Sequence, residues 1–205
     1  QNDMNTKNLS KDLKLFFKSK KTWCAVSTHP GEEKISAEIH KKLLKKFKNL
    51  LLIIIPRHTY RTDEIKAELS ELKLNYHVHS NGKKISNRTN VYLVDTYGET
   101  GLFFDISKNI FMGKSFLNDG GQNPLEPARK NCNILYGPKV SNFKEIYKYL
   151  NDQKIAFKVK NPNKLYNKLN YLLDNTKKSN KGENKLKIIG DKILKKSVKE
   201  IEGFI

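Results

Sequence analysis

Asp119-Gly-Gly-Gln-Asn-Pro-Leu-Glu-Pro-Ala128 is the stretch that decides the fold, because it joins a glycine-containing loop to the start of a helix. A short apolar run at residues 110–113 precedes it, and another at residues 133–138 follows it. Runs of this length between turn residues are typical of buried strands. The region therefore predicts a strand, a loop, a helix and a second strand in succession.

Inside this stretch the residue types favour an anion-binding helix start. Gly120 and Gly121 allow backbone angles that other residues resist. Asn123 suits the N-cap, and Pro124 suits the first helical turn. Free N–H groups at such an end attract phosphate, carboxylate or sugar hydroxyls, with the Glu126 carboxylate at the rim. A capped helix with a dipole-favoured glutamate is the alternative.

Strands and helices alternate along the rest of the chain. Residues 50–55 are six consecutive aliphatics, typical of a strand buried on both faces of a parallel sheet. The predicted strands are 22–26, 50–55, 75–79, 90–94, 110–113, 133–138 and 156–159. The predicted helices are 9–19, 32–48, 61–72, 98–107, 141–151 and 161–173, besides the one that follows Asn123. This order predicts an α/β fold with a doubly wound, mostly parallel, Rossmann-like sheet.

The chain divides into four predicted segments. Residues 1–20 form a lead-in segment, and residues 21–175 form the Rossmann-like domain. Residues 176–185 read as a charged linker. Residues 186–205 carry an apolar stripe against a lysine-rich face, which predicts an amphipathic helix. That helix packs either on this domain, on a partner domain or on a membrane surface.

Charge and composition limit the classes of function. The formal net charge is +19, yet only four of the 40 basic residues are arginine. Lysine spread over the whole length indicates compositional bias more than a reader of phosphate geometry, so nucleic-acid binding is disfavoured. Attraction to acidic headgroups stays open. Cys24 and Cys132 fall in apolar runs and suit small core positions. No run is long enough for a membrane span, so we expect a soluble chain.

Polar side chains gather where the predicted strands end. Because the carboxyl ends of parallel strands meet at one edge, we expect these side chains to line one crevice. They are Ser27, Thr28, His29, Arg57, His58, Gly98, Glu99, Gln122, Asn123 and Glu126. The chain has no Gly-x-Gly-x-x-Gly and no Walker sequence. A phosphate-and-hydroxyl pocket with an arginine and two carboxylates suits a nucleotide-sugar.

Two histidines elsewhere are candidate metal ligands. His77 and His79 point to one side of a predicted strand because side chains alternate along a strand. No further ligands are found at suitable spacing, so we interpret them as part of a polar edge strand and expect no metal site.

Five motifs, in order and spacing, resemble one enzyme family. They are Ser27–Glu33, Pro56–His58, Asp95–Leu102, Gly120–Ala128 and Tyr136–Pro138. Together they are similar to the C-terminal half of bacterial 3-deoxy-D-manno-octulosonic acid (Kdo) transferase, a GT-B glycosyltransferase. The resemblance runs from about residue 23 to residue 173.

The resemblance implies a domain that binds CMP-Kdo, or CMP, with no cofactor and no bound catalytic metal. Arg57, with His58 beside it, would contact the nucleotide, and Gly98 and Glu99 would offer a helix N-terminus near the phosphate. Asn123 and Glu126 would contact the ribose or sugar hydroxyls. Ser27 and Thr28 would lie along the hinge side of the cleft.

The family's transfer, with inversion at the anomeric carbon, is to a lipid A precursor at the cytoplasmic face of the inner membrane. Its N-terminal lobe, with the membrane anchor, acceptor groove and general base, has no counterpart in these residues. We therefore expect no catalytic residue in this chain, which would bind the donor without turning it over.

The motifs depart from the family pattern at two places. Thr59-Tyr-Arg61 replaces the common Pro-Glu-Arg and leaves Arg61 as a possible second cation, while Gln122 stands where histidine is common. Two other interpretations stay open. One is the donor domain of another GT-B enzyme or an epimerase that uses a UDP-sugar. The other is a non-catalytic basic module that binds anionic lipid or nucleic acid.

Overall fold

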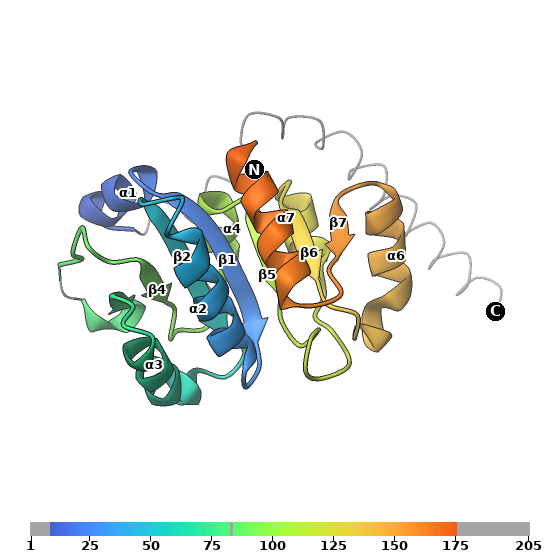
Figure 1. The fold of residues 1–205 in the computed structure, drawn as a ribbon, viewed down its shortest axis with the longest axis horizontal. Coiled ribbons are helices and arrows are strands. Elements are labelled where there is room, and N and C mark those ends of the chain that lie inside the picture. Colours follow the sequence, from blue (N-terminus) through green and yellow to red (C-terminus); the bar gives the residue numbers. More distant parts are fainter. Residues whose placement is uncertain (1–8, 83, 176–205) are drawn as a thin grey trace, which may run out of the picture.

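A seven-stranded sheet forms the centre of the molecule, with the strand order β3-β4-β2-β1-β5-β6-β7 (Figure 1). The computed structural model describes residues 9–82 and 84–175. All six neighbouring strand pairs in these ranges are parallel. The predicted fold class, a doubly wound Rossmann-like sheet, is confirmed.

The strands lie close to their predicted positions. They are β1 (Lys21–Thr28), β2 (Leu50–Pro56), β3 (Tyr76–Val78), β4 (Val91–Leu93), β5 (Asn109–Met112), β6 (Asn133–Tyr136) and β7 (Ala156–Lys158). The prediction works best for β2, where all seven residues are buried. His79 is a correction, because it lies just beyond β3 in a short 3-10 helix. Cys132 is buried as expected but precedes β6.

The helices also follow the predicted order. They are α1 (Lys11–Lys18), α2 (Glu32–Leu43), α3 (Thr62–Glu71), α4 (Thr100–Ile106), α5 (Leu125–Arg129), α6 (Lys144–Asp152) and α7 (Pro162–Asp174). Short 3-10 helices occur at Thr59–Arg61, His79–Asn81 and Ser141–Phe143. Helix α2 ends at Leu43, five residues before its predicted end. The predicted linker at 176–185 and the amphipathic helix at 186–205 lie outside the described residues.

Helices cover both faces of the sheet. Residues of α2, α3 and α7 pack with one set of alternating strand side chains, including Trp23 and Ala25. Residues of α1, α4, α5 and α6 pack with the other set, including Cys24 and Val26. Successive strand residues point to opposite faces, so each inner strand must be apolar throughout. Helix α1 buries Phe16 in the second of these cores.

The carboxyl ends of β1 and β5 approach closely because Gly113 has no side chain. A Cβ atom at Gly113 would lie 2.4 Å from the backbone oxygen of Ser27 and 2.6 Å from Cα of Thr28. Backbone atoms cannot yield as the end of a flexible side chain can. Gly113 therefore sets the distance between the two strand ends on which the crevice is built.

Substitution Gly113→Ala should lower the free energy of unfolding by about 3 kcal/mol, the scale of an overpacked core site. Gly82→Ala is the matched control, because no atom lies within 4 Å of the added Cβ and only its φ of +58° is unfavourable. That control should cost about 1 kcal/mol. Urea denaturation of both variants measures the difference, and equal losses would contradict the close-approach argument.

A buried histidine makes the stability of the α2 face depend on pH. The Trp23 indole donates a hydrogen bond from Nε1 to His40 Nδ1 at 3.2 Å, and both residues are fully buried. Burial lowers the pKa of His40 to about 3. The unfolded chain takes up this proton near the ordinary histidine pKa of about 6.5. Folding therefore favours the neutral ring.

Because the folded-state pKa is depressed, this stabilisation is complete above about pH 6.5 and is lost as the pH falls. We expect His40 to contribute a decline of up to about 1.4 kcal/mol per pH unit between pH 6 and 4. Denaturation across this range should show a shallower decline for His40→Gln than for the unsubstituted chain. Parallel curves would overturn this assignment.

Candidate functional site

The predicted crevice corresponds to the carboxyl ends of β1, β2 and β5, and the name crevice is kept below for this edge of the sheet. Strand β1 pairs with β2 on one side and with β5 on the other. The loops that follow β1 and β5 diverge at this topological switch point, at the bottom of the view in Figure 1. In open parallel sheets, ligands bind outside the carboxyl ends of the strands at such a point.

The Glu32 carboxylate joins these two loops. Its Oε2 accepts hydrogen bonds from the backbone N–H of His29 at 3.1 Å and of Lys114 at 2.6 Å. Its Oε1 accepts from the N–H of Ser115 and Phe116, both at 3.0 Å. The residue is fully buried and lies in the first turn of α2, where a negative charge is favourable. Glu32 thus fixes the loop after β5 against the loop after β1.

Ser27 and Thr28 are the last two residues of β1, which extends two residues beyond the predicted strand 22–26. Ser27 has a φ of +52°, a left-handed conformation that is uncommon for a residue with a side chain. The pairing of β1 with β2 shifts register between Val26 and Thr28 at the same place. Arg57 donates its backbone N–H to the Thr28 carbonyl at 3.0 Å. The chain is thus bent at the crevice and tied to the loop after β2.

Arg57, His58 and His29 lie together at this edge. The Arg57 side chain is exposed and has no hydrogen bond or ion pair with any described residue. The rings of His29 and His58 meet edge to face at 5.7 Å, and His58 stacks on Tyr60. Burial lowers the pKa of His29, and the charge of Arg57 adds to this effect. At neutral pH this edge therefore favours the neutral His29 ring beside an unpaired guanidinium.

The loop after β5 brings Gln122 to the same group. Gln122 Nε2 lies 3.5 Å from His29 Nε2, and the Gln122 carbonyl accepts a hydrogen bond from the Tyr147 hydroxyl at 2.8 Å. The Gln122 side chain thus faces the His29 ring. Gln122 is also a position at which the sequence departs from the family pattern.

The sequence predicts Asn123 as the N-cap of the following helix, and this is wrong, because the helix begins one residue later and Pro124 is its N-cap. The Asn123 Oδ1 still accepts a hydrogen bond from the Leu125 N–H at 3.0 Å. The helix predicted to follow Asn123 is short, because α5 has only five residues. Glu126 is exposed in its first turn and makes no side-chain hydrogen bond within the described ranges. The structure leaves Glu126 open to a ligand without joining it to Arg57.

Gly98 and Glu99 follow β4. Gly98 has a φ of +84°, and Glu99 is the N-cap of α4, which begins at Thr100. The Glu99 carboxylate accepts a hydrogen bond from the Thr96 hydroxyl and pairs with His79 Nε2 at 3.1 Å. Glu99 is thus oriented by its neighbours, and the His79 ring lies inside this network.

Arg61 is not a second cation for the crevice. Its Nη1 pairs with Glu33 Oε1 at 2.8 Å, and its Nη2 pairs with Glu64 Oε1 at 2.9 Å. Arg61 and Glu33 are both buried. Burial raises the pKa of Glu33, which makes the adjacent guanidinium necessary to keep the carboxylate charged. The arginine side chain is thus used within the fold.

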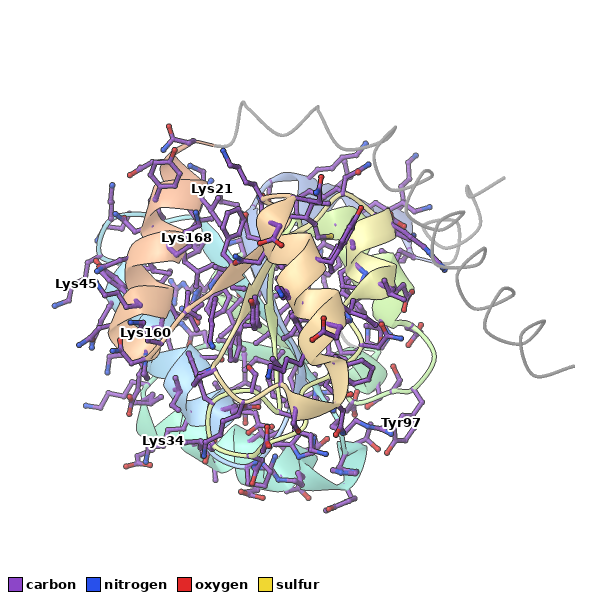
Figure 2. All side chains as sticks on the ribbon, turned by 90° about the vertical axis from the view of Figure 1, so that its right-hand side faces the viewer. Lys21, Lys34, Lys45, Tyr97, Lys160 and Lys168 are labelled. Carbon is purple, nitrogen blue, oxygen red and sulfur yellow. The ribbon has the colours of Figure 1, made fainter. Side chains whose placement is uncertain are left out.

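Two residues that the sequence did not single out contribute to the crevice. Lys114 has a φ of +53°, and a Cβ at Gly120 would lie 3.2 Å from its Nζ. Its charge acts on His29, as does that of Arg57. Tyr97 projects from the loop after β4 at the lower right of Figure 2, is 66% exposed and accepts a hydrogen bond from the Thr59 N–H at 3.4 Å. Ordinary lysine and tyrosine in loops carry no sequence signal for such positions.

Two searches of the described residues bear on the class of site. Nowhere in residues 9–82 and 84–175 do three or more histidine, cysteine, aspartate or glutamate side chains gather closely enough to hold a metal ion. No helix in these ranges has the length and apolar character needed to cross a bilayer.

Sequence comparison identifies several relatives named 3-deoxy-D-manno-octulosonic acid transferase. The chain is 34% identical to 3-deoxy-D-manno-octulosonic acid transferase of Rickettsia conorii, over 98% of this chain and 44% of the relative. It is 38% identical to the enzyme of the same name from Haemophilus influenzae, over 62% of this chain and 30% of the relative. No protein-family model matches the chain.

The fold is similar to a solved structure, the C-terminal CMP-Kdo binding domain of WaaA from Acinetobacter baumannii. The TM-score is 0.78 with 27% identity, over 86% of this chain and 92% of that chain. The chain is related to the C-terminal domain of the Kdo transferases. It spans less than half the length of these two curated relatives, so it matches one part of a Kdo transferase. The crevice described above lies in the part of the chain that is similar to this C-terminal domain.

Substitution Glu32→Gln should release the loop after β5. A carboxamide has one acceptor oxygen, and its NH₂ group would face two backbone N–H donors. We expect a loss of about 3 kcal/mol in the free energy of unfolding, the scale for hydrogen bonds to a charged group. Amide hydrogen exchange at Ser115 and Phe116 should accelerate as well. The exposed Glu38→Gln on the same helix is the control, and an equal effect there would contradict this role of Glu32.

Proposed function

We propose that this chain is the donor-binding half of a Kdo transferase and that it binds CMP-Kdo. The observation that carries the proposal is the similarity in fold to a CMP-Kdo binding domain over 92% of that domain. The relatives in sequence carry the name of the whole enzyme. The substrate of this chain is inferred from them.

The geometry at the crevice supports a nucleotide phosphate beside Arg57. This guanidinium is exposed and lies next to His29 and His58 at the switch point. An arginine fork matches the oxygens of a phosphate group, and it stabilises the negative charge that develops on CMP as it departs. Lys114, on the opposite loop, supplies the second positive charge in place of Arg61.

We assign the hydroxyl groups of the donor to the loop after β5 and the start of α5. Glu126 is an exposed carboxylate whose oxygens accept no hydrogen bond from any described residue. Asn123 lies three residues before it, and its amide N–H₂ donates to no described residue. Both residue types pair well with sugar hydroxyls. We assign Ser27, at the bend of β1, to the opposite wall of the crevice. The resemblance implies Thr28 there as well, but the Thr28 side chain is fully buried.

The remainder of the reaction rests on the resemblance. The Kdo group would pass, with inversion and without a catalytic metal or cofactor, to a lipid A precursor at the cytoplasmic face of the inner membrane. The enzyme would then act in lipopolysaccharide biosynthesis. A second lobe of the enzyme would supply the acceptor groove and the general base, while the residues described here would hold the donor.

Calorimetric titration with CMP, UMP and CMP-Kdo tests the proposal. We expect cytidine nucleotides to bind selectively. Arg57→Ala and Glu126→Ala should each weaken binding by roughly 1–3 kcal/mol, the scale for losing a hydrogen bond to a charged group. Arg88→Ala and Glu145→Ala are the matched controls, because both side chains are exposed and lie outside the crevice.

The outcomes separate the competing functions. A preference for UMP would indicate a UDP-sugar enzyme of the same fold. An affinity that falls steeply with salt concentration and is unchanged by Arg57→Ala would indicate a non-specific basic module. Equal effects of the four substitutions would overturn the assignment of the crevice residues.

A further inference from the structure

A second cleft lies at the β6–β7 side of the sheet, under α6, on the side of the molecule that faces the viewer in Figure 2. Its volume is about 560 Å³, within the usual range for small-ligand sites. The lining residues are Asp119, Tyr136, Pro138, Lys139, Val140, Ser141, Lys144, Tyr147, Lys148, Asn151 and Lys158. None of these residues was assigned to the donor in the crevice.

The cleft has a rigid aromatic floor. The rings of Tyr136 and Tyr147 stack with centroids 4.2 Å apart, and both side chains are almost completely buried. The Tyr147 hydroxyl is fixed by its hydrogen bond to the Gln122 carbonyl. The cleft is therefore a formed feature of the fold, and it shares the loop after β5 with the crevice.

Positive charge dominates the walls. Four lysines line the cleft, and Lys144, Lys148 and Lys158 have no hydrogen bond or ion pair with any described residue. The one lining carboxylate, Asp119, accepts hydrogen bonds from the backbone N–H groups of Gly120 and Ser141, and these bonds lower its pKa. A further carboxylate, Asp152, lies near Tyr136. The net charge around the space remains positive.

The placement of Lys144 is unfavourable for the free protein. Lys144 is the first residue of the nine-residue helix α6, where the helix dipole disfavours a cation. Lys148 is one turn further along, so both ammonium groups share a face. An anion in the cleft would be attracted by the two lysines and by the helix end together. The arrangement thus fits a bound negative charge better than an empty surface.

Another lysine-lined cleft shows that composition alone does not explain this arrangement. Lys20, Lys21 and Lys108 line a space of about 370 Å³ at the amino ends of β1, β5 and β6. Each of these three donates to a backbone carbonyl: Asn87, Leu173 and, for Lys108, Phe104 and Lys130. Those lysines are used by the fold, whereas three of the lysines under α6 are left available.

We propose that the cleft under α6 is a second binding site, which takes a phosphate-bearing ligand. Three ammonium groups around one space suit a diphosphate or a phosphorylated sugar, because ammonium groups bind phosphate as point charges. The volume accommodates a body larger than phosphate alone, and the tyrosine edges with Pro138 and Val140 provide an apolar wall for it. The site does not depend on the proposed donor.

The test uses inorganic pyrophosphate and glucose 6-phosphate as probes, with glucose as the uncharged control. Amide chemical shifts are followed during titration at constant ionic strength. We expect changes at Ser141, Lys144, Lys148 and Lys158. The triple variant K144A/K148A/K158A should bind pyrophosphate at least tenfold more weakly. The control K41A/K42A/K45A removes the same charge from exposed lysines of α2 and its C-terminal end.

Vesicle sedimentation distinguishes the two sources of such a phosphate group. Vesicles with phosphatidic acid are compared with vesicles of phosphatidylcholine alone. Retention that only the K144A/K148A/K158A variant loses supports the site and identifies a lipid headgroup, whereas binding of the soluble probes alone supports it and identifies a free phosphorylated compound. Absence of both, or equal loss in the α2 control, would overturn the proposal. Unchanged thermal unfolding of both variants shows that any loss is not due to misfolding.

Discussion

One buried carboxylate holds the crevice in shape. Glu32 accepts four backbone hydrogen bonds from the loops after β1 and β5, which are 82 to 84 residues away in sequence on the β5 side. A buried charge is tolerable only when its lone pairs are satisfied, and here they are. Both loops are thereby fixed through backbone atoms. These bonds use no side-chain atom of either loop, so the scaffold of the site and its chemistry depend on different residues.

The same separation applies to the other charged residues of this edge. Arg61 and Glu33 form a buried pair between α2 and the loop after β2, whereas Arg57, four residues earlier, stays exposed. Removing one member of a buried pair is costly, because the other is left uncompensated. Arg61 therefore cannot turn toward a ligand without breaking the fold. The available cations at the crevice are Arg57 and Lys114, on opposite sides of the switch point.

The hydrophobic pattern of the sequence was enough to predict the sheet, but it did not predict which polar groups pair with each other at the site. Strand β2 lies close to its predicted position because six consecutive aliphatics favour a strand that is buried on both faces. The contacts of His29 with His58 and Gln122 follow from the parallel topology, which brings the loops after β1, β2 and β5 to one edge. Residue type does not show that Glu32, Glu33 and Arg61 are all buried, since burial depends on neighbours distant in sequence. The helix after Asn123 begins one residue later than predicted, so Pro124 and not Asn123 is its N-cap.

The lysine excess becomes informative only when the partner of each lysine is considered. A basic composition raises the potential over the whole surface and so cannot select one place. Lysines that donate to carbonyls, as Lys21 and Lys108 do, already satisfy part of the backbone. Others contact aromatic rings, as Lys168 does with its Nζ atom 3.7 Å from the centroid of the Phe157 ring. A lysine with neither role, at the unfavourable end of a helix and facing a formed cleft, remains to be explained, and a bound anion explains it.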